Sequence, residues 1–288
     1  MLSWPSSGPP PGVVADYSQP IQRTLFTTLF AVPRDDAPTC ASWVADLLQH
    51  RDPPRRLRAV RAIKDYLTQR IDDRIANPAH PGGTGLLDAL ADAQLDDRPL
   101  SGEKMLDIAF LMVMASLDTL ANSLSFSFHY LAQHTDHQHQ LAADPASSVR
   151  AAEELLRLHS VVNIARTATR DTTLADAHIA ADDRVLLCLS LAGRDPDTYP
   201  HPTTADLARP ATPGHLAFGA GPHRCLGARI ATDALTAALR EWHRSIPAYT
   251  IPAEADIQTG GGAVCSLDAL PLTWPIRHRS DGHADPTG

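Results

Sequence analysis

Cysteine is scarce in this chain of 288 residues, which has four cysteines and no C-x-x-C pair. That spacing excludes a zinc knuckle and a thioredoxin-type redox motif. Because unpaired thiols are typical of a reducing compartment, we expect a cytoplasmic protein. Basic residues are outnumbered, with 25 Lys and Arg against 33 Asp and Glu and a net charge of −8. This balance disfavours a nucleic-acid partner.

Long apolar runs are also lacking. No uncharged apolar stretch reaches about 18 residues, so we expect no transmembrane helix and no membrane partner. The start, MLSWPSSGPPPG, has neither the basic nor the apolar region of a secretory signal. The remaining composition, 43% apolar and 20% charged, is typical of a globular protein. Residues 1–13 and 278–288 are rich in Pro, Ser, Gly, Asp and His, which predicts a disordered leader and tail around a single domain over 14–277.

Helical periodicity dominates the first half of the chain. Apolar residues recur at steps of three and four over 57–75, the pattern of an amphipathic helix that follows Pro53 and Pro54. A short helix is expected over 85–94. The segment 102–134 is apolar on most sides and predicts one long buried helix. Asp118 lies in its middle, where a carboxylate costs several kcal/mol unless it is hydrogen-bonded or used.

The second half mixes helix and strand signals, and the whole predicts a mainly α fold with minor β. Prolines and weak periodicity predict a long irregular loop over 194–217, and loops of that length are usually functional. The other expected elements are a helix over 146–159, a strand over 161–170, a hairpin turn over 180–185, a short buried helix over 185–193, a helix over 226–244 and a strand over 269–274.

One segment carries clear chemistry, the sequence F-G-A-G-P-H-R-C-L-G at 218–227. Its glycines let the backbone turn tightly and approach a flat or bulky group. Cys225 lies just before a predicted helix, where the free N–H groups and the dipole stabilise a thiolate. A thiolate held in this way is a good ligand for a redox metal. The alternative for an isolated cysteine is a core residue before an ordinary helix.

This segment resembles the haem-binding loop of the cytochrome P450 family, whose pattern is F-G-x-G-x-H-x-C-x-G. Glu154-Leu155-Leu156-Arg157 is similar to the family's E-x-x-R, and Ala115–Thr119 is similar to its oxygen-groove motif. The stretches 206–209, 117–127 and 269–274 also resemble the family, in particular its bacterial camphor monooxygenase type. The resemblance extends from Asp16 to Trp274 and implies a P450 fold without the family's N-terminal part.

The resemblance implies a role for each matched residue. Cys225 would be the axial thiolate ligand of haem b iron, and His223 and Arg166 would contact the propionates. Asp118 and Thr119 would relay protons. The other implied haem contacts are Phe218, Gly219, Gly221 and Ala115. The implied structural network is Glu154, Arg157 and Arg209, and the implied pocket residues are Leu111, Met114 and Val162.

Two departures from the family bear on function. Ser116 stands where the oxygen groove has a glycine, and residues 1–100 contain no W/H-x-x-x-R motif for a propionate. An oligomer, a partner or the proline-rich leader could complete the wall of the haem pocket; the alternative is a degenerate copy of the family. The implied reaction is O2-dependent monooxygenation of a small hydrophobic substrate with a ferredoxin-type electron donor. The alternatives are a non-oxidative cyclisation, dehydration or isomerisation, and a non-catalytic haem-binding or interaction protein.

Two further clusters have open interpretations. Arg224, Arg229, Arg240 and Arg244 form either a face for an acidic electron donor or an ordinary solvated helix face. His137-x-His139, in a group with His129 and His134, forms either a metal site or an exposed helix end.

Overall fold

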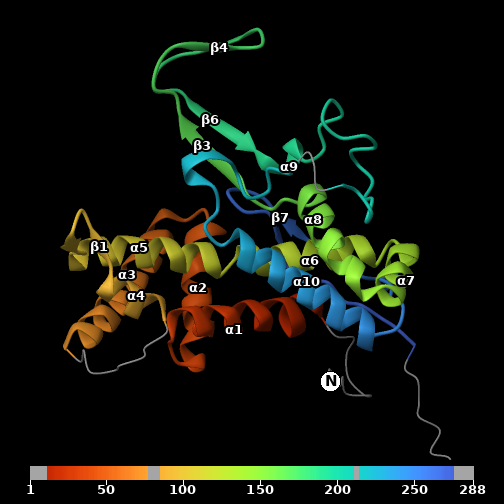
Figure 1. Ribbon diagram of the computed structural model, residues 1–288, viewed down its shortest axis with the longest axis horizontal. Helices are drawn as coiled ribbons and strands as arrows, with labels where there is room; N and C mark the ends of the chain where they lie inside the picture. Colours follow the sequence, from red (N-terminus) through yellow and green to blue (C-terminus); the bar gives the residue numbers. More distant parts are fainter. Residues whose placement is uncertain (1–11, 77–84, 211–213, 276–288) are drawn as a thin grey trace, which may run out of the picture.

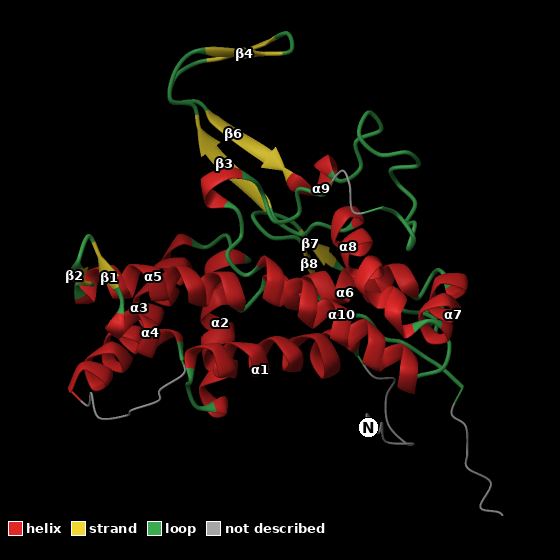
Figure 2. Cartoon of the chain, in the orientation of Figure 1, coloured by secondary structure: helices red, strands yellow, loops and turns green. Residues whose placement is uncertain are grey.

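Helices dominate the computed structural model, which describes residues 12–76, 85–210 and 214–275 (Figures 1 and 2). The helices are α1 Gln19–Phe30, α2 Ala37–Leu48, α3 Pro53–Ala76, α4 Leu86–Asp92, α5 Gly102–Ser116, α6 Thr119–Leu131, α7 Thr135–Ala143, α8 Ser148–Leu158, α9 Leu189–Ala192 and α10 Ala228–Ser245. The strands are β1 Gln94–Leu95, β2 Arg98–Pro99, β3 Asn163–Thr167, β4 Thr172–Leu174, β5 Ala177–Ile179, β6 Arg184–Cys188, β7 Thr259–Gly260 and β8 Ser266–Leu267. The expected fold class, mainly α with minor β, is confirmed.

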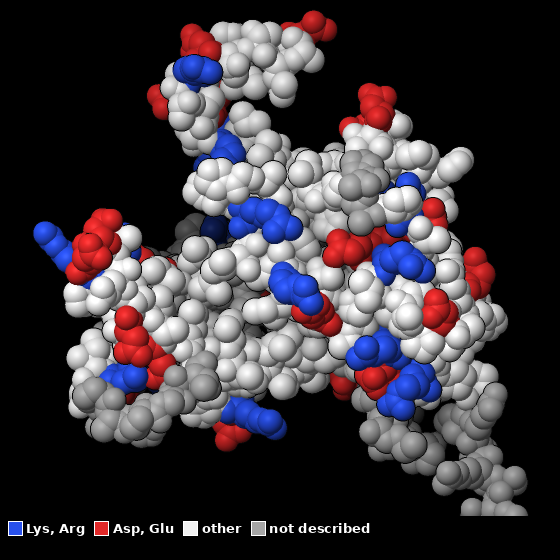
Figure 3. Space-filling view, viewed as in Figure 1, with Lys and Arg blue, Asp and Glu red and all other residues white. Residues whose placement is uncertain are grey.

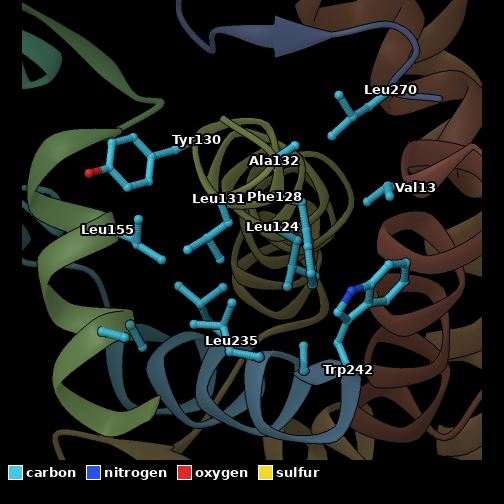
Figure 4. Packing of buried hydrophobic residues seen from close by; sticks show 14 of the residues in the cluster. Val13, Leu124, Phe128, Tyr130, Leu131, Ala132, Leu155, Leu235, Trp242 and Leu270 are labelled. Atoms are coloured by element: carbon cyan, nitrogen blue, oxygen red, sulfur yellow. The ribbon is translucent and has the colours of Figure 1, made fainter. Parts of the chain in front are cut away.

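The buried apolar residues form two clusters. The first gathers around α6, which runs through the centre of Figure 4 between side chains of α8 and α10. Trp242 of α10 is fully buried there, with its ring 4.8 Å from the rings of Tyr17 and Phe128. The second cluster joins α1 to α5, with Ile63 and Leu67 of α3 at its centre. The stripe predicted over 57–75 thus packs into this second cluster.

Each predicted helix near the site is present, with one break. The helices expected over 146–159 and 226–244 correspond to α8 and α10. The single helix expected over 102–134 is wrong, because the chain leaves helical geometry at Leu117 and Asp118 and begins again as α6. Ser101 caps α5, accepting a hydrogen bond from the Lys104 amide at 3.2 Å.

The expected helix over 185–193 is a strand in its first half and a helix only over 189–192. Residues 184–188 form β6, which pairs antiparallel with β3 in the register Asn163↔Cys188 to Thr167↔Arg184, and only α9 is helical. Pairing with a distant strand therefore overrides the local apolar pattern. A turn is present within 180–185, because the Asp183 amide donates to the Ala180 carbonyl at 3.2 Å and Asp182 has φ 70°. It is not the expected hairpin turn, because β5 pairs with β4 and β6 pairs with β3.

The C-terminal segment differs from the expected strand over 269–274. It forms only isolated bridges, Gly12↔Pro271 and Thr250↔Thr273. The expected leader over 1–13 lies mostly outside the described residues, and the expected tail over 278–288 lies wholly outside them. Val13, however, is fully buried and donates its amide to the Leu270 carbonyl at 2.9 Å, so this residue belongs to the core.

The β3–β6 hairpin stands above the helical layer, and the β4–β5 hairpin extends from its tip (Figure 1). The segment Gly102–Leu131 is long and apolar enough to cross a membrane by composition alone. Its second half, α6, is the central helix of the larger core cluster, where Leu124, Phe128 and Leu131 are fully buried.

Candidate functional site

The cysteine loop folds back on itself just before α10. The Cys225 amide donates to the Phe218 carbonyl at 2.9 Å, and the Gly219 amide donates to the Leu216 carbonyl at 2.8 Å. Gly219 and Gly221 have φ values of 67° and 72°, a left-handed conformation that favours glycine. The sequence therefore builds a tight loop whose two ends are joined beside the thiol.

The thiol of this loop is open to the surface. Cys225 is exposed, and Leu226 beside it is 85% exposed despite being apolar. A Cβ atom at Gly221 would have no neighbour within 4 Å, whereas one at Gly227 would lie 4.0 Å from the Cys225 Sγ. A thiol before a helix, with free space around it and apolar surface beside it, fits a large apolar group ligated through sulfur. These residues therefore fit a thiolate-ligated haem.

Strand β3 lies beside the cysteine loop. A Cβ atom at Gly219 would be 3.9 Å from Cδ1 of Ile164 in β3. Arg166, further along the same strand, is exposed and donates from Nη1 to the Ala165 carbonyl at 2.9 Å. His223 in the loop is also exposed. Both candidate propionate ligands thus lie at the surface, on the two segments that Ile164 and Gly219 bring together.

Glu154 and Arg157 of α8 form a buried bidentate pair. Arg157 Nε and Nη2 lie 2.8 Å from the two carboxylate oxygens of Glu154, and the side chains are 2% and 3% exposed. Arg209 Nε lies 3.0 Å from both of these oxygens. The Asp206 amide donates to Glu154 Oε1 at 2.8 Å. These donors together hold the pKa of the Glu154 carboxyl below its ordinary value, against the opposing effect of burial.

The same arginine fastens the long loop that leads to Cys225. Arg157 Nη1 donates to the carbonyl of Pro202 at 2.8 Å and to the carbonyl of Gly193. A Cβ atom at Gly193 would lie 1.9 Å from the Arg157 carbonyl oxygen, so only glycine allows this approach. Arg157 also lies over the Tyr199 ring at 5.0 Å. The α8 pair therefore ties residues 193–209 to the core.

The helix break places an acid and an alcohol side by side in sequence. The Thr119 hydroxyl donates to the Ala115 carbonyl at 2.9 Å, and Ser116 Oγ donates to the Val113 carbonyl at 3.3 Å. Serine and threonine hydroxyls bond back in this way to carbonyls one turn earlier in a helix. Asp118 accepts from the amide of Gln49 at 2.9 Å and from that of Asn122 at 3.1 Å. Burial raises the pKa of the Asp118 carboxyl, and the two amides oppose this shift.

Neither amide partner of Asp118 was predicted from the sequence. Asn122 lies at i+4 from Asp118 on one helix face, so spacing offered a signal for it. Gln49 lies 69 residues away and offered none.

The weak pocket candidates lie on different elements. Leu111 of α5 is 59% exposed, Ala115 is also exposed, and Met114 packs at the edge of the second core cluster. Val162 instead pairs with Val264 next to β3.

The histidine cluster is an aromatic stack. The rings of Tyr130 and His134 lie 3.9 Å apart, and Tyr130 Oη lies 3.2 Å from His137 Nδ1, while His139 is exposed. Across residues 12–76, 85–210 and 214–275, no three His, Cys, Asp or Glu side chains come together as a metal site.

The basic residues of α10 are mostly paired with acids on the same helix. Arg229 lies 2.7 Å from Asp233, and Arg244 lies 2.6 Å from Glu241. Arg240 lies 3.6 Å from the same glutamate. Figure 3 likewise shows acidic and basic side chains intermixed on the visible face. This pairing favours the interpretation of α10 as a solvated helix face.

Comparison with known proteins decides the family. The sequence profile described as Cytochrome P450 matches residues 42–241. The chain belongs to the cytochrome P450 family. Over 91% of its length this P450 is 34% identical to the probable cytochrome P450 127A1 of Sinorhizobium fredii. Over 93% it is 30% identical to the vitamin D3 dihydroxylase of Streptomyces griseolus, of which it covers 66%.

Solved structures agree with this assignment. The P450 CYP105P1 in complex with filipin I is similar with a TM-score of 0.85 and 25% identity, over 94% of this chain and 68% of that one. The cytochrome P450 PksS of Bacillus subtilis 168 gives a TM-score of 0.84 and 27% identity, over 92% and 69%. The chain spans 62% of the Sinorhizobium relative's length. The family carries a thiolate-ligated haem, and Cys225 is the cysteine of the matched motif.

Proposed function

We propose that this P450 catalyses O2-dependent monooxygenation, a hydroxylation, of a small hydrophobic substrate, with haem b held by the Cys225 thiolate. The observation that carries the proposal is the exposed thiol in its glycine-rich loop beside exposed apolar surface. A relative at 30% identity is named as a vitamin D3 dihydroxylase, which supports hydroxylation of an apolar substrate. We also propose a cytoplasmic location and a ferredoxin-type electron donor.

Haem, when bound, supplies the iron at which dioxygen is reduced with electrons from the donor, and a thiolate ligand favours O–O cleavage. Cys225 would ligate the iron, and His223 and Arg166 would hold the propionates. Phe218, Gly219 and Gly221 would form the cradle on the thiolate side. Glu154, Arg157 and Arg209 act through the long loop, whose backbone they fasten to α8.

The α5–α6 break would supply protons. Asp118 holds a proton at a higher pH than an ordinary aspartate, because burial raises its pKa. The Thr119 hydroxyl donates to the Ala115 carbonyl, so its oxygen is left to accept a hydrogen bond from water or from Asp118. An acid next to a hydroxyl suits proton delivery to reduced oxygen. Ala115, Leu111, Met114 and Val162 would line the haem and substrate side.

A covering segment would complete the pocket. Several leucines of α5, β6, α9 and the cysteine loop are exposed although they are apolar; they are Leu111, Leu186, Leu187, Leu191, Leu216 and Leu226. Exposed apolar surface of this kind marks an interaction site. We propose that a further polypeptide, in an oligomer or a partner, covers it and excludes water. Light scattering of the haem-loaded protein tests this, and a monomer with a dry, active site contradicts it.

The decisive experiment is an absorption spectrum of the haem-loaded, reduced protein exposed to CO. A strongly red-shifted Soret band is expected for thiolate ligation, followed by O2 consumption when substrate and an electron donor are added. Haem uptake with no O2 consumption would favour a non-oxidative reaction on the same scaffold. Failure to bind haem would overturn the proposal and leave an interaction protein.

A further inference from the structure

Two amides hold the side chain of Asp118 at the helix break. Gln49, the C-cap residue directly after α2, donates from Nε2 to Asp118 Oδ2 at 2.9 Å. Asn122 donates from Nδ2 to Oδ1 at 3.1 Å and to the Asp118 backbone carbonyl at 2.9 Å. The Leu267 amide donates in turn to Asn122 Oδ1 at 3.2 Å. One amide therefore belongs to the acid's own helix, and the other comes from a separate helix.

Among residues 12–76, 85–210 and 214–275, no charged group contributes to the pKa shift of the Asp118 carboxyl. On α2, Asp46 lies 2.7 Å from Arg55 and 3.7 Å from His50, on the outer side. Asp107 of α5 is exposed, as is Asp268 after β8. The influences on the Asp118 carboxyl are burial and its two amide donors. Within the described structure, the side-chain donors to the Asp118 carboxyl are therefore neutral amides.

A neutral partner differs from a cation in one respect that matters for proton transfer. Lysine or arginine can only donate, so it stabilises the ionised acid and opposes its protonation. A glutamine side chain offers two N–H donors and a carbonyl acceptor. The Nε2 group can donate a hydrogen bond to the carboxylate. After a rotation of the amide, Oε1 can accept a hydrogen bond from the protonated acid. Gln49 can therefore hold Asp118 in place through both protonation states.

We propose that Gln49 is a positioning residue for proton delivery: it holds the Asp118 carboxyl on the α2 side of the α5–α6 break and sets how readily that carboxyl takes up and releases a proton. This inference rests on the proposed function, in which Asp118 and Thr119 deliver protons. Asn122 alone would leave Oδ2 without a protein donor among the described residues. Through this hydrogen bond, the C-terminal end of α2 contacts the acid that would deliver protons.

The first test needs no haem and no turnover. The full chain is labelled with ¹³C at the aspartate side-chain carboxyl carbons, and Asp118 is assigned by Asp118→Asn. Gln49→Met keeps the length of the side chain and removes the donor. The titration midpoint of Asp118 should then rise by about one pH unit, a tenfold gain in proton affinity. Gln49→Glu, which adds a like charge, should raise it further.

The matched control is Gln69→Met, at an exposed position on α3. It should leave the Asp118 midpoint unchanged. An unchanged midpoint in both Gln49 variants would overturn the inference, since Gln49 would then not govern the acid.

The second test uses the haem-loaded enzyme. Gln49→Met should move the high-pH fall of kcat, where Asp118 loses the proton that it delivers, to higher pH together with the carboxyl midpoint, with KM for substrate little changed. A uniform loss at all pH values would indicate a structural role only and would overturn the inference. If the wild type binds no haem or consumes no O2, the proposed function fails, and the carboxyl titration alone then decides the coupling of Gln49 to Asp118.

Discussion

Arg157 and Cys225 carry the two most specific motifs of this P450, yet their surroundings differ. Arg157 is buried with Glu154, and its hydrogen bonds reach the backbone of two loop segments. Cys225 and the adjacent Leu226 are open to solvent. We call Glu154, Arg157 and Arg209, which fasten the long loop, the support of the site. We call Cys225 and Leu226, which are exposed, its surface. Substitutions can test the support and the surface separately.

The largest effect is expected at the surface. Cys225→Ser removes the thiolate, so the red-shifted CO band and all O2-dependent turnover should disappear. The apoprotein should keep its free energy of unfolding to within about 0.5 kcal/mol, because the side chain is exposed. The half-buried Cys188→Ser is the matched control and should keep the band. A red-shifted band in the Cys225 variant would show that another residue ligates the iron.

The next effect concerns the support. Arg157→Met leaves Glu154 buried with its carboxylate short of its main partner, which typically costs about 3–5 kcal/mol. Urea unfolding of the apoprotein, followed by circular dichroism, measures this loss. Arg229→Met is the matched control, because its ion pair with Asp233 is on the surface and should contribute nothing measurable. Equal losses in the two variants would contradict the difference between support and surface.

The support should also make the protein sensitive to acid. Burial lowers the pKa of His159, which ends α8, to about 3. Below pH 6.5 the unfolded chain binds a proton that the folded chain excludes, so the free energy of unfolding falls as the pH drops towards 3. One such group contributes a slope of up to about 1.4 kcal/mol per pH unit.

His159→Phe should flatten this slope, as measured by urea unfolding between pH 7 and about 4. His178→Phe, at an exposed position on β5, is the control and should keep the wild-type slope. Burial also lowers the pKa of His243, to about 4. His243 therefore accounts for the pH dependence of stability that remains in His159→Phe. The same slope in wild type and His159→Phe would contradict the role given to His159.

The smallest effect on stability is expected at Leu226, which is 85% exposed. Leu226→Gln should change the free energy of unfolding of the apoprotein by less than about 0.5 kcal/mol. It should nevertheless weaken haem binding several-fold in a titration, since it replaces apolar surface beside the thiol. Leu174→Gln on β4, where the leucine is 68% exposed, should leave haem affinity unchanged. Equal haem affinities of the wild type and Leu226→Gln would show that Leu226 does not contribute to haem binding.

Local patterns were sufficient for much of the fold and for the pairing of Glu154 with Arg157. The i, i+3 spacing of Glu154 and Arg157 predicted a direct pair, and the structure has one. The apolar stripe of α3 and the helix after Cys225 were likewise visible in the sequence. These features depend on neighbours within a few residues, which a linear sequence displays.

Other features depend on contacts between distant residues. The segment 185–188 has a local pattern that suits a buried helix, but β3 takes it as a strand partner. The break at Asp118 sits inside an apolar run that predicted continuous helix, and Gln49 reaches it from another helix. Neither outcome could be read from spacing, because the decisive partner is remote in the chain.

The sequence by itself determined the mainly α composition, the cysteine loop with its glycines and the pairing of Glu154 with Arg157, because each follows from side-chain chemistry at short range. The tertiary structure alone decided that the backbone of Pro202 joins that pair, that Asp118 is hydrogen-bonded by neutral amides, and that Cys225 is exposed. Burial and the identity of a hydrogen-bond partner are properties of the packed chain, and they set the charge state of each group.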